Sequence, residues 1–154
     1  MAIVSTSDPL VIERPFNWGV LLVSDQFTDD IPGSSQTGFS VSQQALAIAV
    51  RHAQDVDYDD LDLEPDDVVP PTQVRVRVLE GRCPQPTDFD CQIAVPSGKL
   101  SIGDAEHEVL IDVESGTYRI EVALDVAEHP ESVEVWWSPA IAERPISPRP
   151  DTTV

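Results

Sequence analysis

Short segments in which apolar and polar residues alternate dominate the second half of the chain. Residues 74–78 read Val-Arg-Val-Arg-Val, and the same period of two runs through 109–113, 118–124 and 133–137. Successive side chains of a β-strand point to opposite faces, so this period predicts strands with one face in the core and one charged face in solvent. We therefore predict that this half of the chain is built from amphipathic strands.

The first half of the chain carries longer apolar segments. Residues 18–27 have apolar side chains on both alternating faces, which predicts an inner strand covered on two sides, and a shorter strand is expected at 10–12. In 39–50, larger apolar residues are separated by serines and then by alanines. Alanine favours helices, so a helix from about Ser42 is the alternative, but the period of two favours a strand or a hairpin.

Turn signals rich in Pro, Gly, Asp and Ser separate these segments. Repeated short strands with such turns between them predict an all-β, antiparallel sandwich of about eight strands. A chain of 154 residues suits a single domain. We expect the β-sandwich domain to cover residues 1–137. The segment 138–154 contains four prolines, which cannot donate to a sheet, and it predicts an extended Pro-rich tail.

The overall charge restricts the classes of partner. The chain has 28 acidic and 9 basic side chains and a net charge of −19 at pH 7. Such a surface repels nucleic acid and anionic membranes and attracts cationic proteins. No apolar run approaches the roughly 18 residues of a membrane span, and the N-terminus does not resemble a signal peptide, so we expect a cytoplasmic location.

Much of the negative charge lies in one segment, which we call the acidic segment and which runs from Asp55 to Asp67. No Lys or Arg occurs between Ala53 and Thr72. The eight carboxylates of the segment belong to Asp55, Asp57, Asp59, Asp60, Asp62, Glu64, Asp66 and Asp67. Carboxylates this close repel one another and cannot be buried unpaired. The segment is therefore either a solvated loop, a cation site or a docking surface for a basic partner.

A docking role has a geometric basis. On an extended chain, carboxylates two residues apart lie on one side at a separation of roughly 6–7 Å. That separation is close to the spacing of phosphates along a nucleic-acid strand. A protein that binds phosphates with Lys and Arg could accept such a row of carboxylates instead, with an affinity that falls as salt is added.

The sequence offers little support for a metal site, a cofactor or a catalytic group. Asp55, Asp57 and Asp59 resemble the start of a calcium-binding EF-hand loop, but the sixth position is Asp60 instead of Gly and the twelfth is Asp66 instead of Glu. The two cysteines, at positions 83 and 91, are too few for a zinc site. In a reducing compartment we expect them to be thiols, and the alternative is a disulfide that closes a small loop. We predict a non-enzymatic protein without a cofactor.

Two aromatic residues are candidate anchors for a partner. If Val133, Val135 and Trp137 face the core, Trp136 faces outward, and exposed tryptophan is enriched at binding hot spots. Phe27 follows the apolar segment of the first half and precedes a polar loop. The alternative for Trp136 is that its strand is covered on both sides, for example by the tail.

Several short segments resemble the ComJ family of small acidic inhibitors of a competence nuclease. The segments, in order, are Asp-Gln-Phe at 25–27 followed by a polar loop with Pro32, Phe-Ser-Val-Ser at 39–42, Ile-Ala-Val-Pro at 93–96 and Asp-Val-Glu-Ser-Gly-Thr-Tyr-Arg at 112–119. The resemblance implies a β-sandwich and an inhibitor or immunity role.

These observations lead to one leading hypothesis for function. We expect an inhibitor or immunity-type protein that blocks a basic partner, such as a nuclease or toxin, through the acidic segment, with Trp136 or Phe27 as the buried anchor. The alternative is an accessory binding module of a larger assembly, in which the acidic segment is only a solubilising spacer. Direct binding of nucleic acid or a membrane is not expected.

Overall fold

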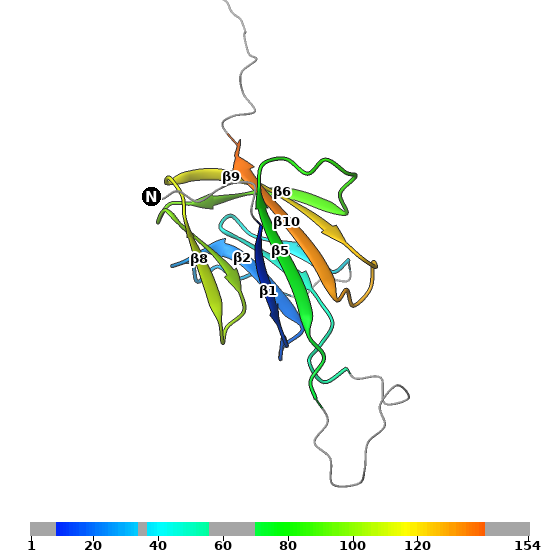
Figure 1. The fold of residues 1–154 in the computed structure, drawn as a ribbon. Helices are drawn as coiled ribbons and strands as arrows, with labels where there is room; N and C mark the ends of the chain where they lie inside the picture. The colour runs from blue at the N-terminus through cyan, green and yellow to red at the C-terminus, as the bar shows by residue number, and fades with distance from the viewer. Residues whose placement is uncertain (1–8, 34–36, 56–69, 141–154) are drawn as a thin grey trace, which may run out of the picture.

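The structure is a two-sheet β-sandwich (Figure 1). It is a computed structural model that describes residues 9–33, 37–55 and 70–140, and these residues form ten strands and no α-helix. The strands are β1 (Leu10–Arg14), β2 (Val20–Asp25), β3 (Phe39–Val41), β4 (Ala45–Ala49), β5 (Val74–Glu80), β6 (Phe89–Val95), β7 (Lys99–Gly103), β8 (Glu108–Asp112), β9 (Gly116–Leu124) and β10 (Ser132–Pro139).

Each sheet has five strands. Sheet A has the order β1-β5-β10-β9-β6, and sheet B has the order β3-β4-β2-β7-β8. Every neighbouring pair is antiparallel except β5 and β10, which run parallel. The predicted all-β, antiparallel sandwich is confirmed. The described chain has ten strands where about eight were expected, partly because residues 39–49 form a hairpin of two strands.

The core lies between the inner faces of the two sheets. The valines at 74, 76 and 78 of β5 are all buried, and Arg75 is exposed, as the alternation predicted. Opposite them, β2 and β4 contribute Leu21 and Ile48, which face each other in register and are fully buried. Burial of side chains of this size stabilises the fold by about 1.5–3 kcal/mol each.

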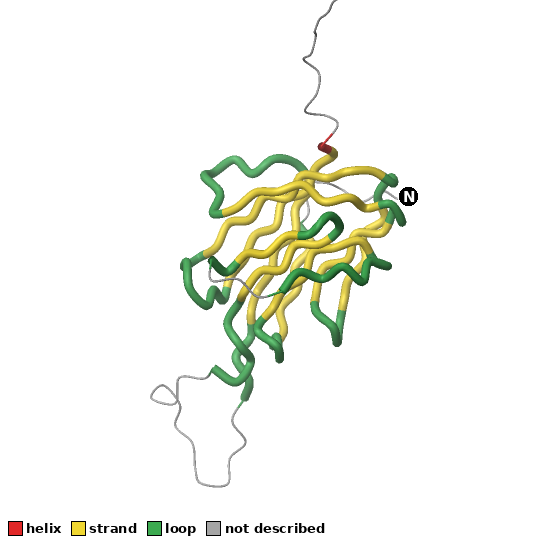
Figure 2. The backbone as a smooth tube through the Cα atoms, turned by 180° about the vertical axis from the view of Figure 1, so that it is seen from behind, coloured by secondary structure: helices red, strands yellow, loops and turns green. Residues whose placement is uncertain are grey.

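The alanine-rich segment 45–49 is a strand, as we favoured. β4 pairs with β2 on one side and with β3 on the other, so these ladders override the helical preference of alanine. Ala45 and Ala47 on the other face of β4 are also buried, and the loop that follows β2 passes over this side of sheet B in Figure 2. The Ser42 hydroxyl donates to the Asp30 carbonyl oxygen at 2.6 Å and ties this loop to the β3–β4 turn.

The predicted ends of two segments need correction. β2 begins at Val20 and ends at Asp25, so Trp18 and Phe27 lie in the turns on either side of it. β10 continues past Trp137, because Ser138 and Pro139 pair with β9. The rest of the predicted tail, from residue 141, lies outside the described residues. No helix of the described chain has the length and apolar character needed to cross a membrane.

Candidate partner-binding site

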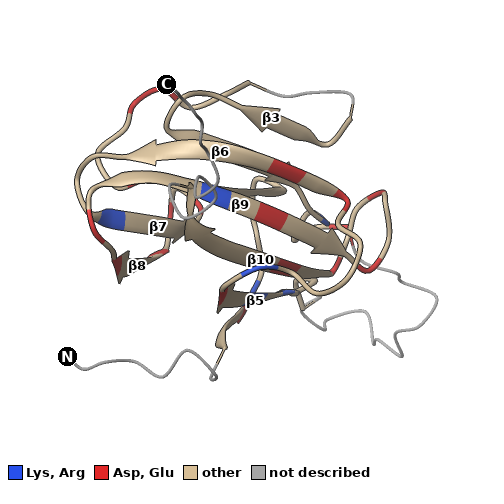
Figure 3. Ribbon diagram, turned by 90° about the horizontal axis from the view of Figure 1, so that it is seen from above, with Lys and Arg blue, Asp and Glu red and all other residues tan. Residues whose placement is uncertain are grey.

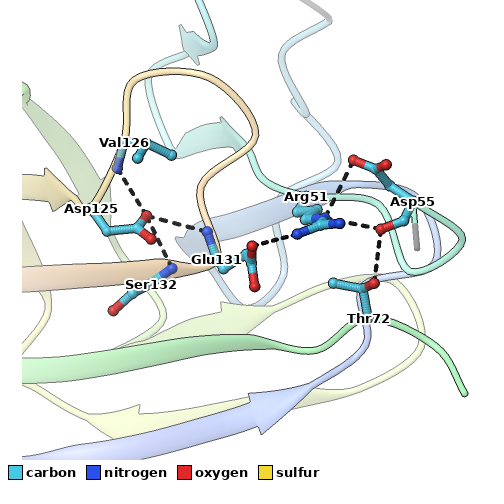
Figure 4. Close-up of polar contacts among 7 residues, drawn as sticks. All are labelled: Arg51, Asp55, Thr72, Asp125, Val126, Glu131 and Ser132. Carbon is cyan, nitrogen blue, oxygen red and sulfur yellow. Dashed lines mark hydrogen bonds and ion pairs between the residues drawn. The ribbon is translucent and has the colours of Figure 1, made fainter. Parts of the chain in front are cut away.

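The described chain stops at Asp55 and resumes at Pro70, and the two flanks of this gap are joined by hydrogen bonds (Figure 4). The Asp55 carbonyl oxygen accepts from Arg51 Nε at 2.9 Å and from Thr72 Oγ1 at 2.8 Å. The Thr72 amide donates to the Ala53 carbonyl at 2.8 Å. The acidic segment is therefore attached to the sandwich at a closed base whose two sides hold each other.

Arg51 connects this base to the turn between β9 and β10. Its Nη1 forms an ion pair with Glu131, its Nε lies 3.4 Å from Asp55 Oδ2, and its amide donates to the Pro130 carbonyl at 3.0 Å. The Arg51 side chain is only 21% exposed, whereas those of Asp55 and Glu131 are 52% and 50% exposed. One guanidinium is thus shared by two carboxylates that remain largely in solvent.

The β9–β10 turn is rigidly organised. Asp125 Oδ1 accepts from three backbone amides, those of Val126 at 2.9 Å, Glu131 at 3.2 Å and Ser132 at 3.2 Å (Figure 4). A carboxylate that accepts several amide hydrogens closes a turn. The turn therefore holds the Asp125 side chain in a fixed position beside the base of the acidic segment.

Several turns meet at this end of the sandwich, which we call the acidic end. It consists of residues 15–19, 50–55, 70–73, 104–107 and 125–131. In sheet B, β2 starts here while β4 and β7 end here, and in sheet A, β5 starts here while β9 ends here. Backbone hydrogen bonds such as that from the Arg51 amide to the Pro130 carbonyl join the ends of the two sheets. These ranges carry six carboxylates and one Arg or Lys, which is Arg51, and Arg14 at the end of β1 adds a second arginine that pairs with Asp104 at 3.2 Å. The six are Asp55, Asp104, Glu106, Asp125, Glu128 and Glu131.

The structure does not bring the predicted partner-binding residues into one site. Five of the eight lie outside the described residues: Asp57, Asp59, Asp60, Asp62 and Glu64. The other three are far apart in the fold. Asp55 is at the acidic end, whereas Phe27 follows the last residue of β2 and so lies at the opposite end of the sandwich. Trp136 lies on the outer face of sheet A, since its neighbours Val135 and Trp137 pack toward the core.

Phe27 is a highly exposed aromatic residue, with 76% of its surface in solvent. Its amide donates to Asp25 Oδ2 at 3.0 Å, and the other oxygen of Asp25 accepts from the Ser97 amide at 2.9 Å. Asp25 is buried, so its role is to hold two loops together. These hydrogen bonds fix the chain around Phe27, which lies at the end of the sandwich opposite to the acidic end.

Trp136 belongs to a mixed-charge surface. Its Nε1 donates to Glu134 Oε1 at 3.1 Å, and Glu134 also pairs with Arg77 at 2.7 Å. Farther along the same face, the buried Glu121 accepts from Arg82 Nε at 2.9 Å. Figure 3 shows basic and acidic positions following one another along β9. Trp136 is half-buried and already has a polar partner, so it projects less than Phe27 does.

Sequence reasoning missed the exposed aromatic residue of the acidic end, which is Trp18. It was assigned to the apolar face of a strand, but it lies in the turn before β2 and is 68% exposed. The neighbouring Gly19 has a φ of +67°, a conformation that favours glycine. Pro15 and Gly19 on either side were the signal in the sequence that could have placed Trp18 in a turn.

Two further observations concern metal ligands and cysteines among the described residues. Among them, no group of three or more His, Cys, Asp or Glu side chains is placed to hold a metal ion. Cys83 and Cys91 are free thiols, as expected. Burial, followed by the charge of Asp90, raises the pKa of Cys91 to about 11, which keeps it protonated at neutral pH.

Comparison with known proteins relates the chain to others by its fold. No family model and no curated protein matches the sequence. Among solved structures, the chain is similar to ComJ from Bacillus subtilis, described as an inhibitor of the DNA-degrading activity of NucA. The TM-score is 0.53 at 10% identity, over 86% of this chain and 98% of ComJ. The protein of crocagin biosynthetic gene J is also similar, with a TM-score of 0.46 at 13% identity, over 86% of this chain and 96% of that one.

At 10% identity, the match to ComJ defines the class of fold and no more. The resemblance to the ComJ family drawn from short sequence segments therefore holds at the level of structure: this chain is a two-sheet sandwich similar to that of ComJ.

Proposed function

We propose that this protein is a non-enzymatic inhibitor or immunity-type protein that blocks a basic enzyme, such as a nuclease, by covering the positive surface that receives phosphates. The observation that carries the proposal is the acidic end, where six carboxylates outnumber the two arginines that pair with them: Arg51, which Asp55 and Glu131 share, and Arg14, which pairs with Asp104. The described residues on either side of the acidic segment, Asp55 and Pro70, belong to this end. The similar fold of ComJ, an inhibitor of a DNA-degrading activity, supports the same class of function.

Electrostatics assigns separate roles to charge and to apolar contact. A concentration of one sign of charge raises the association rate with an oppositely charged protein by about 10- to 1,000-fold at low salt. Charges at the rim of an interface affect the association rate more than the dissociation rate, whereas buried aromatic residues slow dissociation. We therefore assign steering to Asp55, Asp57, Asp59, Asp60, Asp62 and Glu64. Phe27 and Trp136 are candidate anchors, each of which would require a contact away from the acidic end.

The function is tested directly by inhibition. The purified chain is titrated into a panel of nucleases that includes NucA and any nuclease encoded beside its gene, and DNA cleavage is measured at low and at physiological salt. We expect stoichiometric inhibition of one basic member of the panel. A chain that leaves every member active and binds none of them would contradict the proposal.

The steering role predicts the behaviour of a charge variant. Replacing Asp57, Asp59, Asp60 and Asp62 with Asn should slow association with the inhibited nuclease by about tenfold at low salt and flatten the dependence of the rate on salt. Stopped-flow mixing at several salt concentrations measures both quantities. Dissociation should change much less, because these side chains act before contact.

A matched control removes four charges from the opposite end of the sandwich. The variant Asp29→Asn, Asp30→Asn, Asp112→Asn, Glu114→Gln changes the net charge by the same amount, through exposed side chains near Phe27 and the β8–β9 turn. It should associate faster than the first variant. Equal rates for the two variants would show that only net charge matters. Unchanged rates for the first variant would leave the acidic segment as a spacer.

A further inference from the structure

Trp18 is an exposed tryptophan on a turn that the structure holds fixed. It is 68% exposed, although tryptophan is among the residues that folding usually covers to a large extent. The turn has firm supports on both sides. Phe16 is fully buried and its carbonyl accepts from the Gly19 amide at 3.0 Å, while the Gly19 carbonyl accepts from the Val50 amide at 2.9 Å. The indole is therefore presented to solvent on a preorganised backbone.

Carboxylates flank this turn. Asn17 Nδ2 donates to Glu106 Oε1 at 2.5 Å, which ties the turn to the exposed β7–β8 turn. On the other side, the His52 ring lies close to Gly19. Its Cδ2 atom is 3.5 Å from the position that a Cβ on residue 19 would occupy. The His52 carbonyl oxygen accepts a hydrogen bond from the Asp55 amide at 3.0 Å. The turn that carries Trp18 is thus joined to the β7–β8 turn through Asn17 and lies close to His52 through Gly19. The arginines of this end are already paired, Arg51 with Asp55 and Glu131, and Arg14 with Asp104.

An exposed indole at an end of the sandwich rich in carboxylates is suited to one kind of occupant. A guanidinium or ammonium group is attracted to the face of an indole and to a neighbouring carboxylate at the same time. Nucleic acid is repelled by the same carboxylates. A second copy of the chain would bring two such sets of negative charge together, so it too is disfavoured. The chemistry therefore favours a protein surface rich in Arg and Lys.

We propose that Trp18 is the anchor of the docking surface, and that it stacks on an Arg or Lys side chain of the basic partner while the neighbouring carboxylates pair with its other cations. This inference rests on the proposed function, and it places the point of contact at the acidic end. Phe27 lies at the opposite end, and Trp136 is half-buried with its indole nitrogen bonded to Glu134. Trp18 combines wide exposure, a fixed backbone and an acidic setting.

The test compares two exposed aromatic residues at opposite ends. The probe is the nuclease that the wild-type chain inhibits in the panel described above. Trp18→Ala should raise the Kd about 10- to 100-fold, mainly through faster dissociation, as expected for a hot-spot residue. Phe27→Ala removes the candidate anchor at the opposite end, and a loss of affinity in Phe27→Ala as large as that in Trp18→Ala would overturn the assignment of the anchor to Trp18. Association of Trp18→Ala at low salt should stay close to wild type, because the carboxylates are intact.

The outcomes separate this inference from the proposed function. Thermal melting of both alanine variants checks that they remain folded, and exposed side chains should change it little. If the wild-type chain inhibits a nuclease and Trp18→Ala binds it equally well, the anchor is elsewhere and this inference is overturned while the inhibitor role stands. If the wild-type chain binds no basic nuclease, both proposals are overturned. Trp18→Phe, which keeps an aromatic face, should recover much of the affinity, and a failure to do so would also count against stacking.

Discussion

Burial controls the chemistry of individual side chains in this protein, and the thiols are the clearest case. Cys91 lies in β6 opposite Ile120 of β9, where desolvation and the charge of Asp90 together raise its pKa from 9.0 to about 11. Because the thiolate is the reactive form, only about one Cys91 in a thousand is reactive at pH 8. Cys83 lies in the loop that follows β5, outside the paired strands.

This difference predicts unequal thiol reactivity. In Cys83→Ser only Cys91 remains, and in Cys91→Ser only Cys83 remains, so the reaction of each variant with a chromogenic disulfide reports on one thiol. At pH 8 we expect Cys91 to react at least tenfold more slowly than Cys83, and its rate to rise as the pH approaches 11. Both should react quickly once the chain is unfolded in guanidinium. Equal rates in the folded variants would contradict the assigned burial.

At the scale of elements, the β7–β8 hairpin depends on one close backbone approach. A Cβ added to Gly103 would lie 2.1 Å from the His107 carbonyl oxygen and 2.8 Å from the Glu108 Cα. Asp104 holds the turn in this form, since its Oδ1 accepts from the Glu106 and His107 amides, each at 3.0 Å. Both contacting atoms belong to the backbone and cannot move aside as a flexible side chain can, so a larger residue at position 103 would displace the backbone.

The hairpin therefore predicts a strong effect of a small substitution. Gly103→Ala should lower the free energy of unfolding by about 2–3 kcal/mol, because the clash forces a backbone shift in a packed sheet. Urea denaturation followed by fluorescence measures the change. Gly116→Ala is the control: no atom lies within 4 Å of its added Cβ, and it should stay within about 0.5 kcal/mol of wild type. Similar losses in the two variants would argue against this close approach.

At the scale of the whole molecule, the negative charge is unevenly distributed. The described residues hold 18 acidic and 7 basic side chains, an excess of 11 negative charges. The outer face of sheet A is balanced, because four arginines there face four carboxylates. These residues are Arg75, Arg77, Arg82 and Arg119, and Glu13, Asp90, Glu121 and Glu134. The excess is therefore carried by the rest of the surface, including the acidic end.

A net charge of −19 predicts that salt stabilises the fold. Self-repulsion opposes the compact state, and the screening length falls from about 30 Å at 0.01 M salt to about 8 Å at 0.15 M. We expect the melting temperature to rise by about 3–6 °C between these conditions, which corresponds to roughly 1 kcal/mol for a domain of this size. Calorimetry at the two salt concentrations measures the melting temperature. The four-Asn variant of the acidic segment, with a net charge of −15 (−19 plus four), should show a smaller rise, and a melting temperature that falls with salt would refute the explanation.

Much of the architecture could be predicted from local pattern alone. Alternation in residues such as those of β5 and β9 reports directly on which side chains are buried, because a strand has two faces and a period of two. The strand at 45–49 was less certain, since alanine favours helices and the deciding contacts come from β2 and β3. The predicted ends of β2 were wrong for a related reason. An alternating pattern assigns an apolar residue such as Trp18 to the core unless the turn beside it is recognised.

The candidate site was predictable only in its charge. The amino-acid sequence by itself determined that this protein is a strongly acidic, all-β chain with its carboxylates crowded between Asp55 and Asp67, because composition and periodicity are local properties. Only the tertiary structure decided that β5 and β10 pair in parallel, that Asp55, Phe27 and Trp136 lie on three separate surfaces, and that Trp18 joins the acidic end. Strand order and register arise from contacts between residues far apart in the chain, and no local pattern encodes which turns will meet.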